Sequence, residues 1–216
     1  MTAPPSPRPT PTPVARAGWA LFAVAALAIP AVAMLLERRA PEPPPVFGAL
    51  PDFALTDQTG AALTRDDLLG KTVVVDFIFT RCPDICPTLS AQMAAVGDSL
   101  GPAPFEGPPL HRLSVSVDPT YDQPAVLAEY ARGYGADPAT WSFVTGEQAE
   151  IEALVDGLAQ MVERRGLTED GAPRIAHSQR LLLVDPAGGL RAFHPIDEAG
   201  LAALVTDVEA IAREPR

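Results

Sequence analysis

The chain is poor in the residues that build disulfide-rich scaffolds or nucleic-acid-binding surfaces. Its 216 residues include only two cysteines, which excludes a secreted framework held by several bridges. Basic residues are also in deficit, with 16 Lys and Arg against 27 Asp and Glu and a formal net charge of −11. Such a surface repels a phosphate backbone, so we expect no nucleic-acid partner. A solvated acidic surface is the simplest interpretation of this charge.

Prolines are plentiful but unevenly placed, and they separate an N-terminal region from the folded domain. Eleven of the 25 prolines lie within residues 1–45. Residues 1–17 are polar and Pro-rich, and we expect them to form a disordered cytoplasmic tail. Residues 37–46 have a similar composition and are expected to be a stiff, extended linker. The folded domain is therefore predicted to occupy residues 47–216.

A run of nineteen residues without a charge, 18–36, lies between these Pro-rich segments. As a helix it would span roughly 28 Å, close to the hydrocarbon core of a bilayer at about 30 Å, so we predict a single transmembrane anchor. The alternative is a cleaved signal peptide, because Ala31-Val32-Ala33 has the small-x-small form of a cleavage site. The apolar run continues to Leu36, which favours the anchor, and both alternatives export the domain.

The remaining sequence alternates between strand-like and helix-like patterns. A continuous β-branched and aromatic run, 73–79, is typical of a central strand buried on both faces. The other predicted strands are 53–56 and 61–64, which form a hairpin, and 110–117, 142–144, 180–184 and 190–193; the predicted helices are 88–100, 124–134, 147–158 and 198–212, with a short helical turn in 64–70. This order predicts an α/β domain with a mostly parallel central sheet flanked by helices.

Cys82 and Cys86 stand where strand 73–79 ends and the next helix begins. Unpaired N–H groups at a helix N-terminus favour a thiolate, which is the nucleophilic and metal-binding form of cysteine. On a regular helix, Cβ atoms four positions apart lie about 5–6 Å from each other, wider than the roughly 3.5–4.5 Å of a relaxed disulfide. A metal with bonds to sulfur of about 2.3 Å accommodates this gap, so the spacing favours a metal.

The cysteine pair nevertheless leaves several chemistries open. Pro83 and Pro87 bound the turn, which need not be regular helix, so a disulfide stays open as well. A purely structural bridge would close a very small loop and would gain little from loop entropy. We therefore interpret Cys82 and Cys86 as a site for a metal or for reversible thiol redox chemistry.

Two thiolates make an incomplete metal site, and the chain offers three histidines as a further ligand. His111 follows a Pro-rich loop and opens a predicted strand, which indicates an ordinary exposed histidine. His194 precedes Pro195 near the last strand, and nothing there points to a ligand. His177 lies in a predicted loop just before strand 180–184, and its position makes it a candidate ligand and no more.

These motifs resemble those of the Sco/SenC family of copper-binding assembly factors for cytochrome c oxidase. The matching residues are Thr80-Arg81-Cys82-Pro83-Asp84-Ile85-Cys86-Pro87, the pair His177-Ser178, and the segments 55–60, 114–119, 122–124, 145–146 and 182–188. The resemblance covers about residues 47–212 and implies a thioredoxin-like fold. It also implies one copper ion, Cu(I) or Cu(II), with Cys82, Cys86 and His177 as its ligands. Family members often have Asp before this histidine, where the present chain has Ala176.

The function that this resemblance implies is that of a copper metallochaperone for the binuclear copper centre of cytochrome c oxidase. The implied partner is the copper domain of oxidase subunit II, with other periplasmic copper chaperones or thioredoxin-like reductases as further partners. The implied location is the inner membrane, with one span and the domain facing the periplasm. The alternative is a thiol-disulfide reductase in which Cys82 and Cys86 are the redox-active thiols and keep the oxidase cysteines reduced. A copper or redox sensor and a thiol peroxidase also stay open.

The anchor and the signal peptide predict different mature N-termini. If residues 18–36 are an anchor, fractionation of cells will recover the protein in the membrane, and its N-terminal sequence will begin ahead of residue 18. A soluble protein that begins at Met34 would show instead that the segment is a signal peptide.

Overall fold

Two units divide the chain, residues 1–40 and 41–216, and the computed structural model describes residues 26, 28–29, 41–100, 107–167 and 173–214. The described residues of the first unit are helical. The predicted tail 1–17 lies outside the described residues, and so does nearly all of the predicted span 18–36. Within the described ranges, no helix is both long enough and apolar enough to cross a membrane.

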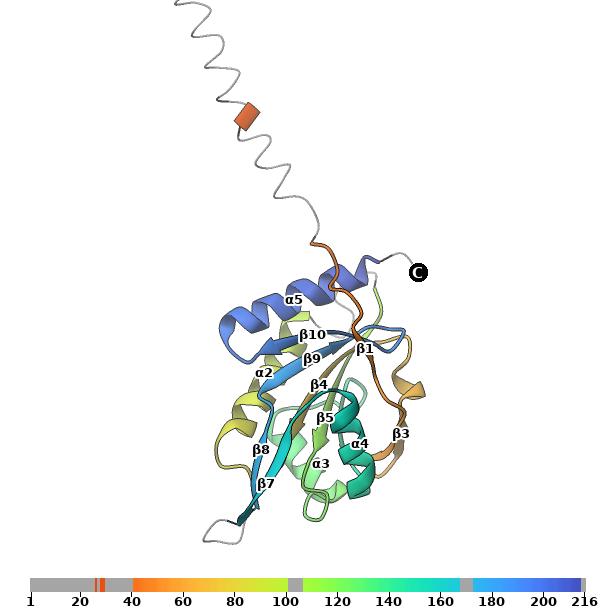
Figure 1. Ribbon diagram of the computed structural model, residues 1–216, viewed down its shortest axis with the longest axis vertical. Helices are drawn as coiled ribbons and strands as arrows, with labels where there is room; N and C mark the ends of the chain where they lie inside the picture. The colour runs from red at the N-terminus through yellow and green to blue at the C-terminus, as the bar shows by residue number, and fades with distance from the viewer. Residues whose placement is uncertain (1–25, 27, 30–40, 101–106, 168–172, 215–216) are drawn as a thin grey trace, which may run out of the picture. The chain divides into compact units, whose positions relative to one another are not determined.

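A mixed sheet forms the centre of the second unit (Figure 1). It has eight strands in the order β1-β10-β9-β4-β5-β6-β2-β3. Its strands are β1 (Gly48–Ala49), β2 (Ala54–Asp57), β3 (Ala62–Thr64), β4 (Thr72–Ile78), β5 (Leu110–Ser116), β6 (Trp141–Thr145), β9 (Arg180–Val184) and β10 (Gly189–Pro195). The predicted parallel centre is confirmed for β4, β5 and β6. The other neighbours pair antiparallel, including β9 on the free side of β4.

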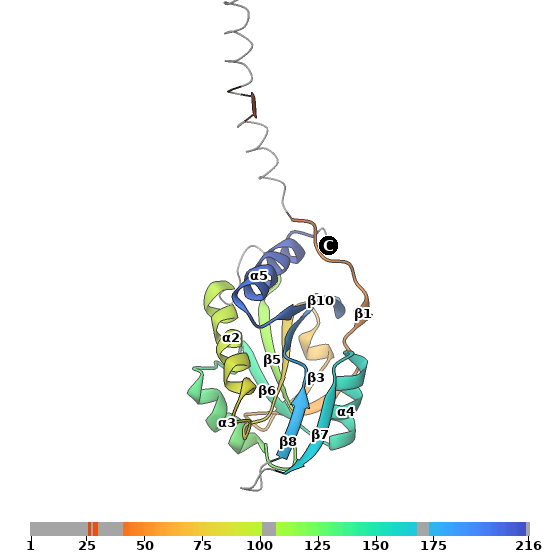
Figure 2. The same cartoon turned by 60° about the vertical axis from the view of Figure 1, so that its left-hand side comes forward.

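Helices cover both faces of this sheet. They are α2 (Ile85–Leu100), α3 (Pro124–Gly133), α4 (Gln148–Gly157) and α5 (Glu198–Ala212), and a 3-10 turn, η1, covers Asp66–Leu68. Figure 2 shows α2, α3 and α5 on one face and α4 on the other. This arrangement follows from right-handed crossovers, because the chain moves across the sheet in one direction from β4 to β6 and then returns to β9. The predicted α/β architecture is therefore confirmed.

The central strand β4 is buried along its whole length. Val73, Val74 and Val75 are at most 1% exposed, as β-branched side chains packed on both faces of a sheet should be. On the helical side, Leu89 and Met93 of α2 are fully buried, and α2 packs against β4 and β5. The residues after β4 are thus held at a well-packed strand end.

The short strand β1 was not predicted, and two further parts of the fold, the start of α2 and a hairpin, differ from the sequence prediction. The helix α2 begins at Ile85 rather than at residue 88, because Pro87 falls in the first turn, where its missing N–H has no helical partner in any case. A hairpin of β7 (Val162–Leu167) and β8 (Pro173–His177) forms a separate two-stranded sheet that was not predicted. Most of β7 is exposed and polar, so no alternation of apolar residues marks it as a strand.

Arg191 on β10 joins three segments that are distant in the sequence. Its guanidinium lies 2.8 Å from Asp185 Oδ2 and 2.6 and 3.0 Å from the two carboxylate oxygens of Glu214, and its Nε donates to the Pro44 carbonyl at 2.5 Å. The side chains of Arg191 and Asp185 are 6% and 7% exposed. One buried cation therefore holds the β9–β10 turn, the residues after α5 and the residues before β1.

Removing this cation should destabilise the domain strongly. We expect Arg191→Met to lower the free energy of unfolding by about 3 kcal/mol, because the buried carboxylate of Asp185 loses its partner. The loss is measured by comparing the urea unfolding of the variant with that of the parent, using the full chain and following the transition of the domain 41–216. The control Arg132→Gln removes an arginine whose side chain is 70% exposed and should cost less than about 0.5 kcal/mol. Equal losses in the two variants would contradict the role of Arg191.

Candidate metal and thiol site

Residues 79–86, here called the Cys loop, connect the end of β4 to the first turn of α2. The N–H of Cys82 donates to the Phe79 carbonyl at 3.1 Å, which turns the chain back on itself. Cys86 is 0% exposed and packs within the core, whereas Cys82 is partly exposed, and both are free thiols. The Cys loop therefore presents one sulfur at the surface and keeps the other beneath it.

Asp122, in the turn between β5 and α3, holds the start of the Cys loop. Its fully buried carboxylate accepts hydrogen bonds from the Thr80 N–H at 3.0 Å, the Thr80 hydroxyl at 2.5 Å and the Ser116 hydroxyl at 2.5 Å. Burial raises the pKa of Asp122, and the hydrogen bonds from Ser116 and Thr80 oppose this rise. Because Thr80 follows β4 and Ser116 ends β5, one carboxylate joins the ends of two parallel strands.

Arg81 fixes the Cys loop from a second direction. Its Nη2 lies 2.7 Å from Asp118 Oδ2, and its guanidinium carbon lies 4.1 Å from the centre of the Tyr121 ring. The Asp118 side chain is only 6% exposed, so this ion pair is largely shielded from water. A shielded ion pair and a cation–π contact restrict Arg81, and with it the residue before Cys82.

His177 reaches the Cys loop from the end of β8. Its Nδ1 lies 3.1 Å from the Ser178 carbonyl oxygen, and its Nε2 lies 3.3 Å from the Cys86 sulfur. Because a carbonyl oxygen only accepts, the proton belongs on Nδ1, and the neutral ring presents the Nε2 lone pair to the thiols. The expectation that His177 lies in a loop is wrong: the β7–β8 hairpin carries it, with its ring edge-on to Phe79.

The structure brings together all three residues that the sequence selected as metal ligands. The donor atoms of Cys82, Cys86 and His177 lie within 4.8 Å of one another. Two ligand atoms on one ion stand roughly 3.5–4 Å apart when the bonds are about 2.3 Å to sulfur and about 2.0 Å to nitrogen. The set therefore fits one metal ion after small adjustments. Two sulfurs and an imidazole suit a soft or borderline ion rather than Mg²⁺ or Ca²⁺.

The two thiols differ in how readily they ionise. The hydrogen bond from Cys86 is the main cause that lowers the pKa of Cys82, and burial opposes it. The same hydrogen bond, together with burial, raises the pKa of Cys86. Cys82 is thus the more readily ionised of the two sulfurs, and Cys86 keeps its proton more tightly. A reactive thiolate beside a proton-bearing sulfur also fits thiol-disulfide exchange.

Asp76 is a further titratable residue of the site region that the sequence analysis did not select. It lies in the middle of β4 with 0% exposure, and neither of its carboxylate oxygens has a hydrogen-bond partner among the described residues. Burial raises the pKa of Asp76 to about 7, and the neighbouring Ser114 hydroxyl is the main influence that opposes this rise. The available signal was a single acidic residue inside the apolar run 73–79, where a charge is costly.

The other two histidines lie apart from the thiols. His111 is 4% exposed and its Nε2 lies 3.0 Å from the Ser142 hydroxyl, so the expectation of an exposed residue is wrong. It is the second residue of β5, which lies between β4 and β6, and burial lowers the pKa of His111 to about 4. His194 is 5% exposed and faces Asp207 of α5 at 3.2 Å. Both histidines belong to the packing of the sheet.

Comparisons with known proteins give a consistent result. Residues 44–213 match the profile of the SCO1/SenC family. The SCO1 protein homolog of Bacillus subtilis is 28% identical over 160 residues, which are 73% of this chain and 80% of that protein. Protein SenC of Rhodobacter capsulatus is 31% identical over 149 residues, which are 67% of this chain and 62% of that protein.

Solved structures of similar shape belong to the same group. BsSco, a member of the Sco family of cytochrome c oxidase assembly proteins with an identified disulfide switch, has a TM-score of 0.66 and 27% identity over 80% of this chain and 97% of its own. Bradyrhizobium japonicum ScoI with copper bound has a TM-score of 0.60 and 26% identity, over 76% and 99%. A SCO1/SenC family lipoprotein of Bacillus anthracis has a TM-score of 0.66 and 25% identity, over 77% and 96%. The mixed α/β fold of the present chain is thus the Sco-like form of the thioredoxin fold.

The unequal thiols predict an unusual pH dependence of alkylation. An ordinary thiol with a pKa of about 8.5 reacts roughly tenfold more slowly for each pH unit below that value. Because the pKa of Cys82 is lowered, its rate with iodoacetamide should change little between pH 8 and pH 6, as followed by peptide mass spectrometry. Cys86→Ala removes the donor and should restore the ordinary decline. A parent protein that already shows that decline would contradict the assigned asymmetry.

Proposed function

The chain belongs to the SCO1/SenC family, and on that basis we propose that it is a copper metallochaperone of the bacterial cell envelope. Under this proposal it binds one copper ion as cargo, with Cys82, Cys86 and His177 as the ligands. It delivers the ion for assembly of the binuclear copper centre of cytochrome c oxidase. The observation that carries the proposal is the grouping of the three donor atoms within 4.8 Å of one another.

The chemistry of the donors supports copper in both common oxidation states. Soft thiolates suit Cu(I), and an imidazole nitrogen lets the same site hold Cu(II). Cys86 and His177 are buried, whereas Cys82 is partly exposed, so an incoming ligand meets Cys82 first. Three ligands with one at the surface favour release by ligand exchange. Cys86 must lose its proton when it becomes a ligand, so loading releases a proton.

We propose the inner membrane as the location, with residues 18–36 as a single-pass anchor, residues 1–17 in the cytoplasm and residues 37–46 as the linker. The domain of residues 47–216 would face the periplasm. The charge-free length of 18–36 supports the anchor. The Bacillus anthracis lipoprotein also supports attachment to a membrane in this family. The proposed partner is the copper domain of oxidase subunit II, with other periplasmic copper chaperones or thioredoxin-like reductases as further partners.

A second candidate function is a thiol-disulfide reductase that keeps the cysteines of the oxidase copper site reduced. The specific observation in its favour is the division of roles between the thiols, with Cys82 as the attacking thiolate and Cys86 as the resolving thiol. The disulfide switch of BsSco points in the same direction. Both functions use the same two sulfurs, so they differ in their need for His177.

His177→Ala separates the two functions. Cu(II) needs the nitrogen donor, so its affinity should fall by more than the roughly 10–100-fold that loss of an outer-shell partner costs. The affinity for Cu(I) should fall less than the affinity for Cu(II), because both thiolates remain. Thiol-disulfide exchange needs only the sulfurs and should continue. Copper titration under oxidising and reducing conditions, alongside a thiol-exchange assay, measures all three.

The controls define what would contradict the metallochaperone. Cys82→Ser and Cys86→Ser should each lose stable copper binding, and retention of a full equivalent of copper by either variant would refute the ligand set. Thermal unfolding of His177→Ala must match that of the parent, since His177 is buried. In cells at limiting copper, normal oxidase assembly with a folded His177→Ala variant would favour the reductase instead.

A further inference from the structure

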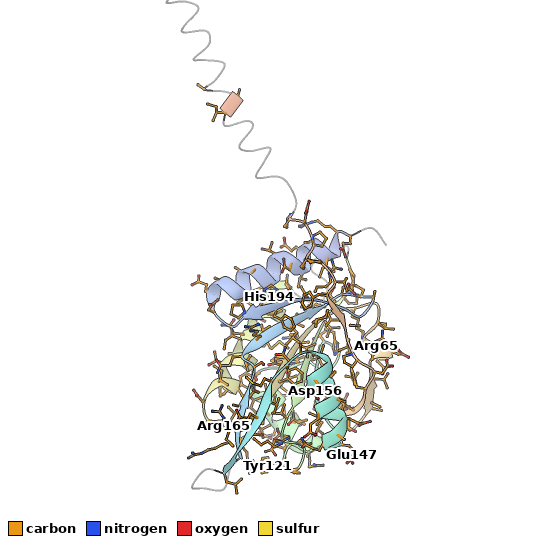
Figure 3. The ribbon with its side chains drawn as sticks, in the orientation of Figure 1. Arg65, Tyr121, Glu147, Asp156, Arg165 and His194 are labelled. Atoms are coloured by element: carbon orange, nitrogen blue, oxygen red, sulfur yellow. The ribbon has the colours of Figure 1, made fainter. Side chains whose placement is uncertain are left out.

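A hollow of about 460 Å³ opens beside Cys82 and His177, and two arginines line it. Arg165 comes from β7 and Arg174 from β8, so both belong to the hairpin that carries His177. Both are exposed. Figure 3 shows Arg165 extending outward from the hairpin, at the same end of the domain as Tyr121, whose ring contacts Arg81 of the Cys loop. Two cationic side chains therefore line the hollow that leads to the partly exposed thiol of Cys82.

The charge of the β7–β8 hairpin contrasts with that of the rest of the chain. Residues 162–177, from the start of β7 to the end of β8, contain three arginines and three carboxylates and so carry no net charge, in a chain whose formal net charge is −11. Asp84 is the single carboxylate among the described residues that line the hollow. The hairpin is thus a local exception on an acidic domain, and it lies where copper would enter and leave.

The arginines keep most of their charge available to a ligand. Arg165 contacts Glu163 at 2.7 and 3.0 Å, but their side chains are 61% and 55% exposed, and such a pair remains hydrated. Arg174 has no ion-pair partner among the described residues. A guanidinium does not lose its proton at physiological pH, so both side chains stay positively charged.

We infer that Arg165 and Arg174 select the exchange partner by charge and favour anionic copper carriers. This inference rests on the proposed function, because copper must be the cargo. A bare or cationic copper species is repelled by two guanidinium groups, whereas Cu(I) held by two thiolates carries a net negative charge and is attracted. An acidic carrier surface would be attracted in the same way.

The exchange itself is balanced without a redox partner. Cu(I) leaves the ligands of the carrier and binds the sulfurs of Cys82 and Cys86 and Nε2 of His177, and its oxidation state does not change. The proton of the Cys86 thiol moves to a vacated ligand of the carrier or to water. The arginines form no bond to copper, so they act as specificity-determining residues.

The first test uses the copper-free protein and two alkylating agents that share a reactive carbon. Iodoacetate is anionic and iodoacetamide is neutral, so the ratio of their rates at Cys82 reports the local field. At low salt, Arg165→Gln/Arg174→Gln should lower this ratio about threefold or more, and about 0.5 M salt should remove most of the difference. The matched control Lys71→Gln/Arg213→Gln makes the same change in net charge at the start of β4 and after α5, and it should leave the ratio unchanged.

The second test measures copper release with two chelators that share a phenanthroline core. Bathocuproine disulfonate is anionic and neocuproine is neutral, and both form coloured Cu(I) complexes. From the copper-loaded protein, Arg165→Gln/Arg174→Gln should slow transfer to the anionic chelator by about threefold or more and leave transfer to the neutral one unchanged. Equal slowing with both chelators, or the same effect in the control variant, would overturn the inference.

The two tests separate failure of this inference from failure of the proposed function. A parent protein that holds no copper refutes the metallochaperone, while the alkylation ratio still decides whether the arginines select for charge. If the parent binds one copper ion but Arg165→Gln/Arg174→Gln leaves the alkylation ratio unchanged, only the inferred selection by charge is refuted, and the metallochaperone stands.

Discussion

A buried carboxylate with three hydrogen-bond donors holds the ends of β4 and β5 together, and the Cys loop begins at that point. Asp122 is 0% exposed, so its charge is stabilised by Thr80 and Ser116 rather than by water. Thr80 is separated from Cys82 by Arg81 alone, which has its own ion pair with Asp118. The position of the surface thiol thus depends on two carboxylates of the turn after β5, which never touch a sulfur themselves.

The site draws its donors from two independent parts of the fold. The main sheet supplies both sulfurs through the junction of β4 and α2, and the separate β7–β8 hairpin supplies the imidazole nitrogen. The contact of 3.3 Å between Cys86 and His177 is where these parts meet. The same geometry suits both proposed chemistries, because Cys86 lies next to the imidazole of His177 as well as near Cys82. Under the proposed function, metal binding would use all three donors, and disulfide exchange would use only the pair on the main sheet.

The sequence predicted the parts of the fold that carry a hydrophobic period. The apolar run of β4, the face of α2 with Leu89 and Met93, and the β2–β3 hairpin all formed as expected. The β7–β8 hairpin has almost no alternation of apolar and polar residues, so the sequence pattern could not predict it. The burial of His111 was missed for a related reason, since neighbours in the sheet cover a residue only after the strands are arranged.

The candidate site was predictable to a different degree for each residue. The spacing of Cys82 and Cys86 after a buried strand indicated thiol or metal chemistry by itself. The position of His177 before strand 180–184 made it a candidate, and only the family resemblance made it an expected ligand, because its proximity to Cys86 depends on the path of an unpredicted hairpin. Asp122 entered the sequence analysis only as part of the matching segment 122–124, and nothing in the sequence signals that it binds Thr80 and Ser116.

The separate sheet that carries His177 has a consequence for how the site opens. Two exposed strands with few buried side chains resist local unfolding less than an eight-stranded sheet with a continuous core. Fluctuations that fray the hairpin would therefore withdraw the nitrogen while β4 and α2 keep both sulfurs in place. Amide hydrogen exchange should be faster in β7 and β8 than in β4. The coordination number of a bound copper ion would then change whenever the β7–β8 hairpin opens locally. Such local opening would cost far less free energy than unfolding the domain.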